Sequence, residues 1–188
     1  VIDNSIEKAL IEELNSRQDI NAERIKRLLA FADLTKEAGS PIKIIADQII
    51  KLPRFTEFDL VDFPRIVSTQ DNFDNLNTPK DHPSRRETDT YYVTESNVLR
   101  THTTDMWSFY LKDLEILKKL EKEGWVGALS TGIVFRKDEI DRKHFPAFHQ
   151  IDGLYLCKKE QKVIAQKDLE EVEIDVAKSI FGKDIEYT

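Results

Sequence analysis

The stretch GIVFRKDEIDRKHFPAFHQIDG, residues 132–153, decides the fold because it reads as two strands joined by a charged turn. Ile133–Arg136 is apolar and ends on a cation, and Phe148–Leu156 alternates polar with apolar residues. The intervening KDEIDRKHFPA is too long and too polar for a tight hairpin turn. The forked guanidinium of an arginine beside such a loop is suited to binding an anionic ligand. The alternative is a solvent-exposed hairpin whose long charged loop binds nothing.

The exact residues of this stretch are more informative than its pattern of charge and hydrophobicity. It resembles motif 2 of phenylalanyl-tRNA synthetase, a class II enzyme, at Arg136-Lys137-Asp138, His144 and Phe148–Gly153. Further segments resemble the same family in order and spacing: Asn72–Leu76, Pro79–Arg85, Tyr91-Tyr92 and Leu99–Thr104. The resemblance covers roughly residues 40–188 and is closest to the single-chain organellar or bacterial type.

The resemblance implies an α+β fold, an antiparallel sheet flanked by helices that is incomplete here. Residues 40–188 would form the N-terminal part of the catalytic domain, with motifs 1 and 2. Residues 1–39 would precede it as a helical hairpin. The parent enzyme would join phenylalanine to tRNA(Phe), using ATP with Mg²⁺.

The bulk composition fits one domain with a real core and a small appendage. The chain has 188 residues, of which 40% are hydrophobic and 34% charged. The lone Cys157 suits a reducing compartment, cytoplasmic or an organelle matrix, and no apolar run approaches the ~20 residues of a membrane span. Val1 is not a natural initiator, which is compatible with a targeting segment upstream. The net charge of −7 counts against general nucleic-acid binding.

Residues 1–39 predict two amphipathic helices. Asn4 with Glu7 resembles a capping box, Asp19 or Asn21 caps the second helix, and Gly39 is expected to end it. The pair is either an arm for tRNA or a partner, or a packing appendage. We favour packing, because its charges are mixed.

Ser40-Pro41 opens a third helix with a broad isoleucine face, which Pro53 stops. A long helix followed by a strand with a proline resembles motif 1. The resemblance implies a dimer interface here, so we expect a homodimer or a synthetase partner subunit to bind through residues 40–67. An ordinary core helix is the alternative.

Residues 71–90 predict an ordered loop, and Tyr91–Val93 a strand. Asp81-His82 lacks a further ligand at metal-binding spacing, so no metal site is predicted. The resemblance places this loop at the wall of the active site, near the tRNA end, where Arg85 and Arg86 are candidate contacts. A solvated loop pair is their alternative.

The site residues are implied by the resemblance. His102 and Thr104 would touch the backbone groups of the amino acid, and Gln150 and Asp152 would hold its α-amino group. Thr103 and Thr104 also have a purely structural explanation as helix N-caps. The residues expected around ATP are Arg136 at the α-phosphate, Asp138 near the adenine amino group, His144 at the γ-phosphate and Phe148 stacked on adenine.

This sequence departs from the family at Trp107, where glutamine is expected, and at Asp152, where glutamate is usual. Both changes bear on amino-acid specificity. Two rival interpretations therefore stand beside the synthetase. One is a non-catalytic module that binds an amino acid, a nucleotide or a partner. The other is a paralogue with altered amino-acid specificity.

The C-terminal part predicts a helix over Leu169–Phe181, ended by Gly182, and a new strand over Asp184–Tyr187. Motif 3, which supplies a second arginine for the nucleotide in the family, is absent from the sequence. We therefore expect this chain to be a fragment, or the ordered part, of a longer synthetase, and inactive alone.

Overall fold

The computed structural model describes residues 2–137, 142 and 144–186. Its helices are α1 (Ser5–Ser16), α2 (Ile20–Leu29), α3 (Pro41–Ile50), α4 (Thr69–Asn72), α5 (Met106–Leu111), α6 (Leu114–Glu123) and α7 (Gln166–Phe181). Its strands are β1 (Asp59–Leu60), β2 (Ile66–Ser68), β3 (Asn97–Leu99), β4 (Trp125–Phe135) and β5 (Ala147–Cys157). Short 3-10 turns lie at Pro53–Phe55, Asp74–Leu76, Pro83–Arg85 and Thr103–Asp105. The mixture confirms an α+β protein.

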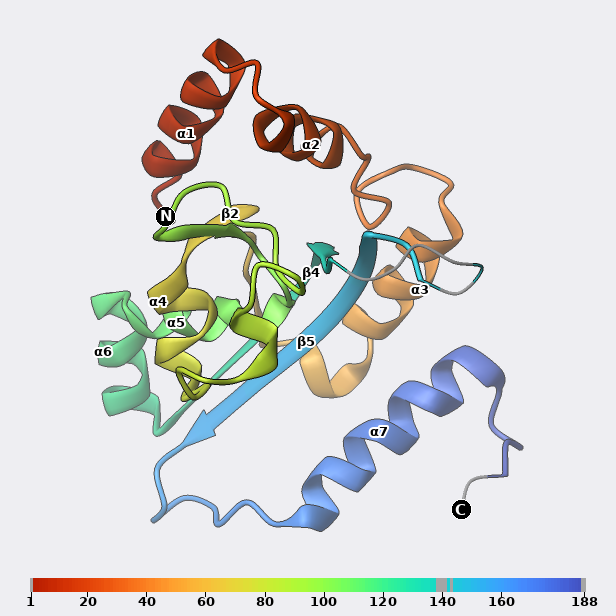
Figure 1. Ribbon diagram of the computed structural model, residues 1–188. Coiled ribbons are helices and arrows are strands. Elements are labelled where there is room, and N and C mark those ends of the chain that lie inside the picture. The colour runs from red at the N-terminus through yellow and green to blue at the C-terminus, as the bar shows by residue number, and fades with distance from the viewer. Residues whose placement is uncertain (1, 138–141, 143, 187–188) are drawn as a thin grey trace.

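A long hairpin of β4 and β5 forms the centre of the molecule (Figure 1). The two strands pair antiparallel from Trp125↔Cys157 to Phe135↔Ala147. The predicted first strand was too short, because Gly127 and Gly132 interrupt the apolar pattern of β4 without breaking its pairing. β1 joins the other edge of β4 in parallel, while β2 and β3 form a separate antiparallel pair.

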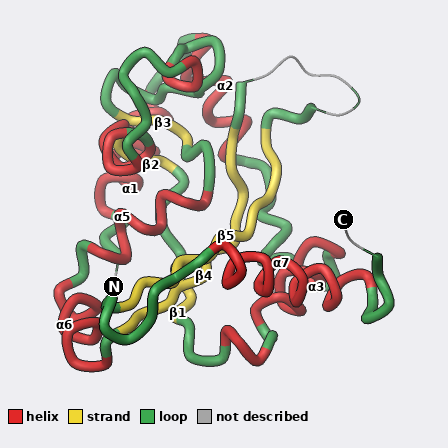
Figure 2. Tube along the Cα trace, turned by 90° about the horizontal axis from the view of Figure 1, so that it is seen from below, coloured by secondary structure: helices red, strands yellow, loops and turns green. Residues whose placement is uncertain are grey.

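The two faces of the hairpin are covered by different helices, because neighbouring strand residues point to opposite faces. Leu129 packs with residues of α3 and Val172 of α7 on one face. Ala128 packs with Met106 and Tyr110 of α5 on the other. In Figure 2, α3 and α7 accordingly lie on one side of the hairpin and α5 and α6 on the other.

Helices α1 and α2 form an angled pair at one end of the molecule (Figure 1). Leu14 and Ile25 are buried against Ile133 and Phe135, near the end of β4. The N-terminal pair thus shares a core cluster with the strand that we expected to carry the nucleotide site.

Two of the predicted helix caps are confirmed, whereas the predicted capping box and one predicted helix end were wrong. The side chains of Asp19 and Ser40 accept hydrogen bonds from Ala22 N and Ile42 N, which confirms both caps. The capping box at Asn4 was wrong, because the Asn4 side chain caps nothing and Glu7 bonds elsewhere. Helix α2 ends at Leu29 rather than at Gly39, whose φ of 81° instead shapes the loop before α3.

One predicted strand was wrong, and another lies partly outside the described residues. Tyr91–Val93 contributes a single bridge, Tyr92↔Val98, because the chain turns back at once into β3. The predicted strand over Asp184–Tyr187 extends beyond the described residues, and its described part, residues 184–186, pairs with no strand. A strand forms only where a partner offers backbone hydrogen bonds.

Candidate active site

The candidate site lies on the α5 side of the hairpin, where successive residue pairs point to the same face. From the middle of the hairpin toward its loop these pairs are Ser130↔Asp152, Gly132↔Gln150 and Val134↔Phe148. At ~3.4 Å per strand residue, Phe148 and Asp152 lie about 14 Å apart. The row therefore suits an elongated ligand with different chemistry at its two ends.

A buried asparagine fixes the loop that faces this row. Asn72 is fully buried, and its Oδ1 accepts a hydrogen bond from Thr101 N at 2.9 Å. Its Nδ2 donates to Thr101 Oγ1 at 2.9 Å. Because both ends of the amide are engaged, the segment from Thr101 to the 3-10 turn Thr103–Asp105 is held against α4.

The loop and the hairpin meet through two hydrogen bonds. Thr104 Oγ1 donates to Asp152 Oδ2 at 2.5 Å, and Thr103 N donates to Gln150 Oε1 at 3.1 Å. The structure thus brings together Thr104, Gln150 and Asp152, three of the residues expected at the amino-acid end. The threonine side chains do not cap a helix, since α5 has no side-chain cap.

His102 and Asp105 form an ion pair beneath this junction. Nδ1 of His102 lies 2.9 Å from Oδ1 of Asp105, which is fully buried. Burial raises the pKa of Asp105 to about 6, against the opposing effect of His102. Burial also disfavours the charged His102, but the carboxylates of Asp105 and Asp152 outweigh it and raise the His102 pKa above its usual 6.5.

Arg100 closes the floor of the site beside Gly132. Its side chain is 1% exposed and donates from Nε to Ile133 O and from Nη1 to Phe63 O, both at 2.8 Å. Its guanidinium stacks on the Phe63 ring, 4.4 Å from the centroid. A side chain at position 132 would overlap Arg100 Nη2, so glycine is needed there.

The residues expected around ATP lie toward the loop end of the hairpin. Arg136 is exposed just beyond β4, and its backbone N donates to Pro146 O at 3.1 Å. Phe148 is half-buried in β5 opposite Val134, and His144 is exposed in the connecting loop. Asp138 lies outside the described residues. Arg136 and His144 are therefore at the end of the row away from Asp152.

Comparison with known proteins adds the family. Residues 27–188 match the model described as "tRNA synthetases class II core domain (F)". The chain belongs to this family. It is 34% identical over 179 residues to the phenylalanine–tRNA ligase alpha subunit of Thermotoga neapolitana, covering 95% of this chain and 51% of that protein. It is 38% identical over 109 residues to the mitochondrial phenylalanine–tRNA ligase of Saccharomyces cerevisiae, covering 56% of this chain and 22% of that protein.

A solved structure supports the fold independently of sequence. Pyrrolysyl-tRNA synthetase from Desulfitobacterium hafniense superimposes with a TM-score of 0.57 at 14% identity, covering 89% of this chain and 55% of that one. This confirms the predicted class II synthetase-like fold. The chain spans about half, or less, of the length of the relatives named above.

Several polar residues around this candidate site were missed by the sequence analysis. Asp105 was not singled out, although its spacing three residues after His102 at a helix start is a usable signal. Arg100 and Asn72 were quoted only within motifs. Ser130, opposite Asp152 and 2% exposed, carried no signal beyond being a polar residue in an apolar strand.

In the loop before β3, one of the two candidate arginines, Arg85, makes its hydrogen bonds within the loop itself. Arg85 Nη2 donates to Asp74 Oδ1 at 2.5 Å and to Thr78 O at 2.6 Å, and the guanidinium lies over the Phe73 ring. Arg86 is exposed. Arg85 thus holds the loop together, whereas Arg86 stays a candidate for contact with nucleic acid.

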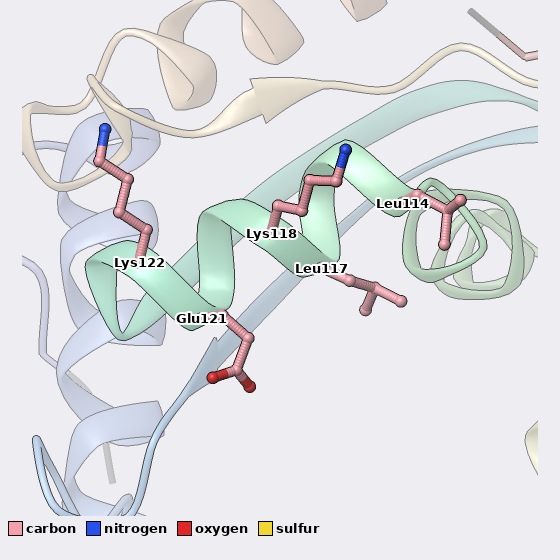
Figure 3. Close-up of a pocket in the computed structure, with 5 residues that line it drawn as sticks. All are labelled: Leu114, Leu117, Lys118, Glu121 and Lys122. Carbon is pink, nitrogen blue, oxygen red and sulfur yellow. The ribbon is translucent and has the colours of Figure 1, made fainter.

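Two surface hollows lie outside this site. One is an open face of α6, and Figure 3 shows that all its labelled side chains come from that helix: Leu114, Leu117, Lys118, Glu121 and Lys122. The other is a polar hollow beside α1 whose lining includes Glu7, Asp33, Asp62, Arg65 and Arg100. The first is one helix surface, and the charged groups of the second serve in internal contacts.

Residues 2–137, 142 and 144–186 are the part of the chain that the structure describes. This part of the chain has no group of three or more His, Cys, Asp or Glu side chains placed to hold a metal ion. None of its helices combines the length and the apolar character needed to cross a membrane.

Proposed function

We propose that the chain carries part of the catalytic domain of a phenylalanine–tRNA ligase. The parent enzyme activates phenylalanine with ATP to phenylalanyl-adenylate and transfers the acyl group to tRNA(Phe). The observation that carries the proposal is the junction at which Thr104 and Thr103 bond Asp152 and Gln150. It joins two segments 48 residues apart in the sequence, both of which resemble the phenylalanine enzymes.

The amino-acid end supplies acceptors for an ammonium group. Asp152 keeps a carboxylate in the row, and Gln150 keeps a carbonyl lone pair beyond the one used by Thr103 N. His102 and Thr104 contact the backbone groups of the substrate. Phenylalanine is the substrate class that the two named ligase relatives support.

The nucleotide end supplies an arginine, a histidine and an aromatic face. Arg136 neutralises charge that develops on the α-phosphate, which is electrostatic stabilisation without a covalent step by the protein. Phe148 stacks on adenine, His144 meets the γ-phosphate, and Asp138 lies near the adenine amino group. Class II synthetases use ATP with Mg²⁺, and the ion enters here as part of the MgATP substrate.

The same proposal includes a protein partner at residues 40–67, either a second copy or a synthetase subunit. The helix α3 exposes apolar side chains: Ile42 by 36%, Ile44 by 58% and Ile45 by 39%. Exposed apolar surface of this kind marks interfaces. An Ile44→Lys variant of the full-length protein should have a smaller mass by light scattering than the wild type, and an Ile20→Lys variant on α2 should not. Equal masses for Ile44→Lys and wild type would contradict this interface.

We place the parent enzyme in the cytoplasm or an organelle matrix, where the lone Cys157 remains reduced. The Saccharomyces cerevisiae relative is mitochondrial by name. Fractionation of source cells with an antibody against this chain tests the location. Recovery with a secreted fraction would contradict it.

Amino-acid-dependent exchange of pyrophosphate into ATP, measured with the full-length protein, tests the function. We expect phenylalanine to support exchange, and Arg136→Ala to reduce it by about 10²–10³-fold. Arg27→Ala, an exposed arginine on α2, is the matched control and should leave exchange unchanged. Unchanged exchange in an active Arg136→Ala protein would sink the proposal.

The same assay separates the two rivals. Exchange with an amino acid other than phenylalanine would favour a paralogue of altered specificity. Trp107 is the residue to examine in that case, because its buried Nε1 has no hydrogen-bond partner within the described chain. Absence of exchange with every amino acid would favour a binding module without ligase activity.

A further inference from the structure

Asp105 is a buried carboxylate with an unusual set of neighbours. It is fully buried, and its Oδ1 lies 2.9 Å from His102 Nδ1 as an ion pair. Neither of its carboxylate oxygens makes a hydrogen bond of good geometry within the described chain. An ionised carboxylate in such a place is costly unless it is paired. The ion pair with His102 is therefore the contact that stabilises the ionised form of Asp105 at this buried position.

The charges around this pair come from three other elements. Arg100, after β3, lowers the pKa of Asp105, whereas Asp71 of α4 raises it. Asp71 is itself paired with Lys112 at 2.5 Å, which offsets its charge. On the other side of the ring, Asp152 of β5 favours the protonated form of His102. Two carboxylates thus act on one imidazole, whose own burial is the opposing effect.

The contact also fixes which edge of the imidazole is buried. Nδ1 of His102 is inaccessible to solvent, while its side chain as a whole is 28% exposed. The exposed part therefore belongs to other atoms of the side chain, and the backbone of Asn72 is a further neighbour that favours the protonated ring. A carboxylate at Nδ1 favours the proton on that nitrogen and leaves Nε2 for a different partner.

We propose that Asp105 is a positioning residue for His102, holding Nδ1 so that a protonated imidazole donates from Nε2 to the carboxylate of a bound amino acid. This inference rests on the proposed function and deepens it. His102 then contacts the anionic end of the zwitterion, and Asp152 the cationic end. The hydrogen bond between Thr104 and Asp152 fixes the acceptor, and Asp105 fixes the donor.

Titration of the histidine rings by NMR tests the first half without a substrate. In the wild-type chain the neutral form of His102 should carry its proton on Nδ1, and its pKa should exceed 6.5. Asp105→Asn should lower that pKa by about one pH unit, whereas Asp184→Asn, an exposed control, should not. A His102→Asn variant assigns the signal among the four histidines.

The wild-type tautomer keeps this test decisive if Asp105→Asn does not fold. A neutral His102 that carries its proton on Nε2 would overturn the proposal. A His102 pKa that is equal in wild type and in folded Asp105→Asn would also overturn it.

Calorimetric binding of phenylalanine and phenylalaninamide to the full chain tests the second half. The amide keeps the ammonium group but has no carboxylate. Asp105→Asn should weaken the binding of phenylalanine by about tenfold at pH 7 and leave the affinity for phenylalaninamide unchanged. Wild-type affinity for phenylalanine should fall as pH rises through the His102 pKa. Equal losses for both ligands would overturn the assignment of the carboxylate to His102.

Failure of the proposed function gives a different result. A wild-type protein that binds no amino acid contradicts the ligase function and the named ligand together. The NMR titration then still decides whether Asp105 holds His102.

Discussion

Among single residues, Gly132 shows how backbone and side chains share the floor of the site. It faces the side chain of Arg100, a buried cation whose bonded partners in the described chain are the carbonyls of Ile133 and Phe63. Burial lowers the pKa of Arg100, with nearby acidic residues opposing the effect. Glycine at 132 leaves space for the guanidinium, so the floor of the site depends on a residue without a side chain.

Gly132→Ala should therefore destabilise the protein by about 1–3 kcal/mol or more. The added methyl group would displace Arg100 Nη2 and strain its hydrogen bonds. Urea unfolding monitored by fluorescence gives the free energy. Gly153→Ala is the matched control on the partner strand, because its nearest neighbour is a movable leucine methyl group at 3.1 Å. Equal losses in the two variants would contradict the role given to Arg100.

The His102–Asp105 pair predicts a pH dependence of stability with a definite sign. Asp105 has a folded pKa of about 6 against 3.8 for the ordinary group. The native state thus binds more protons than the unfolded chain between about pH 4 and 6, and stability falls as pH rises through that window. The raised pKa of His102 likewise gives stability below its unfolded value of 6.5 that is lost at higher pH.

Comparison of Asp105→Asn with wild type isolates this effect from the other acids. The unfolding free energy of the variant should increase relative to that of wild type as pH rises from 4 to 6. Urea unfolding at both pH values measures the difference. A constant difference across the window would show that Asp105 titrates normally in the folded protein.

Among the elements, α1 and β2 are joined by a contact that the sequence analysis assigned to the helix alone. Glu7 Oε1 accepts from Arg65 N at 2.6 Å and from Ile66 N at 3.1 Å. The carboxylate of α1 thus satisfies two backbone donors at the start of β2, which precedes α4 and its buried Asn72. An acidic residue three positions after Asn4 suggests a helix cap from local spacing alone. The contact of Glu7 with β2 depends on the tertiary structure and has no signal in the sequence.

Glu7→Ala should cost about 2 kcal/mol, since it leaves both backbone donors without their acceptor. Glu12→Ala, on the exposed face of the same helix, is the control and should cost less than about 0.5 kcal/mol. Chemical denaturation of both variants provides the comparison. If Glu12→Ala costs as much as Glu7→Ala, helix propensity rather than the contact with β2 explains the loss.

The elements also show what sequence can and cannot reveal. The hairpin, α3 and α7 were predictable, because alternation, a Ser-Pro start and a long apolar stripe are local signals. The amino-acid end of the site stays a prediction from resemblance, and the structure brings its expected residues Thr104, Gln150 and Asp152 together. Asp105 and Arg100 were not recognised, because their roles depend on burial and on partners elsewhere in the chain.

For the whole molecule, the N-terminal pair of helices has the strongest consequence for the site. We expected residues 1–39 to be a separate hairpin, and that boundary stays a prediction. The core cluster of Leu14, Ile25 and Leu28 with Ile133 and Phe135 favours the packing role over a free arm. A second link is His149, whose Nε2 accepts from Leu34 N at 2.9 Å, next to Gln150 in β5.

Ile25→Ala should therefore weaken the hairpin and not only α2. Ile25 is fully buried, so the change should cost about 2–5 kcal/mol. Ile20→Ala, in the same helix but 78% exposed, is the matched control and should cost far less. Amide hydrogen exchange should then quicken at Ile133 and Phe135 in Ile25→Ala, because these strand residues lose their cover. Exchange that quickens in α2 alone would show that the N-terminal helices are an independent unit and that the site does not depend on them.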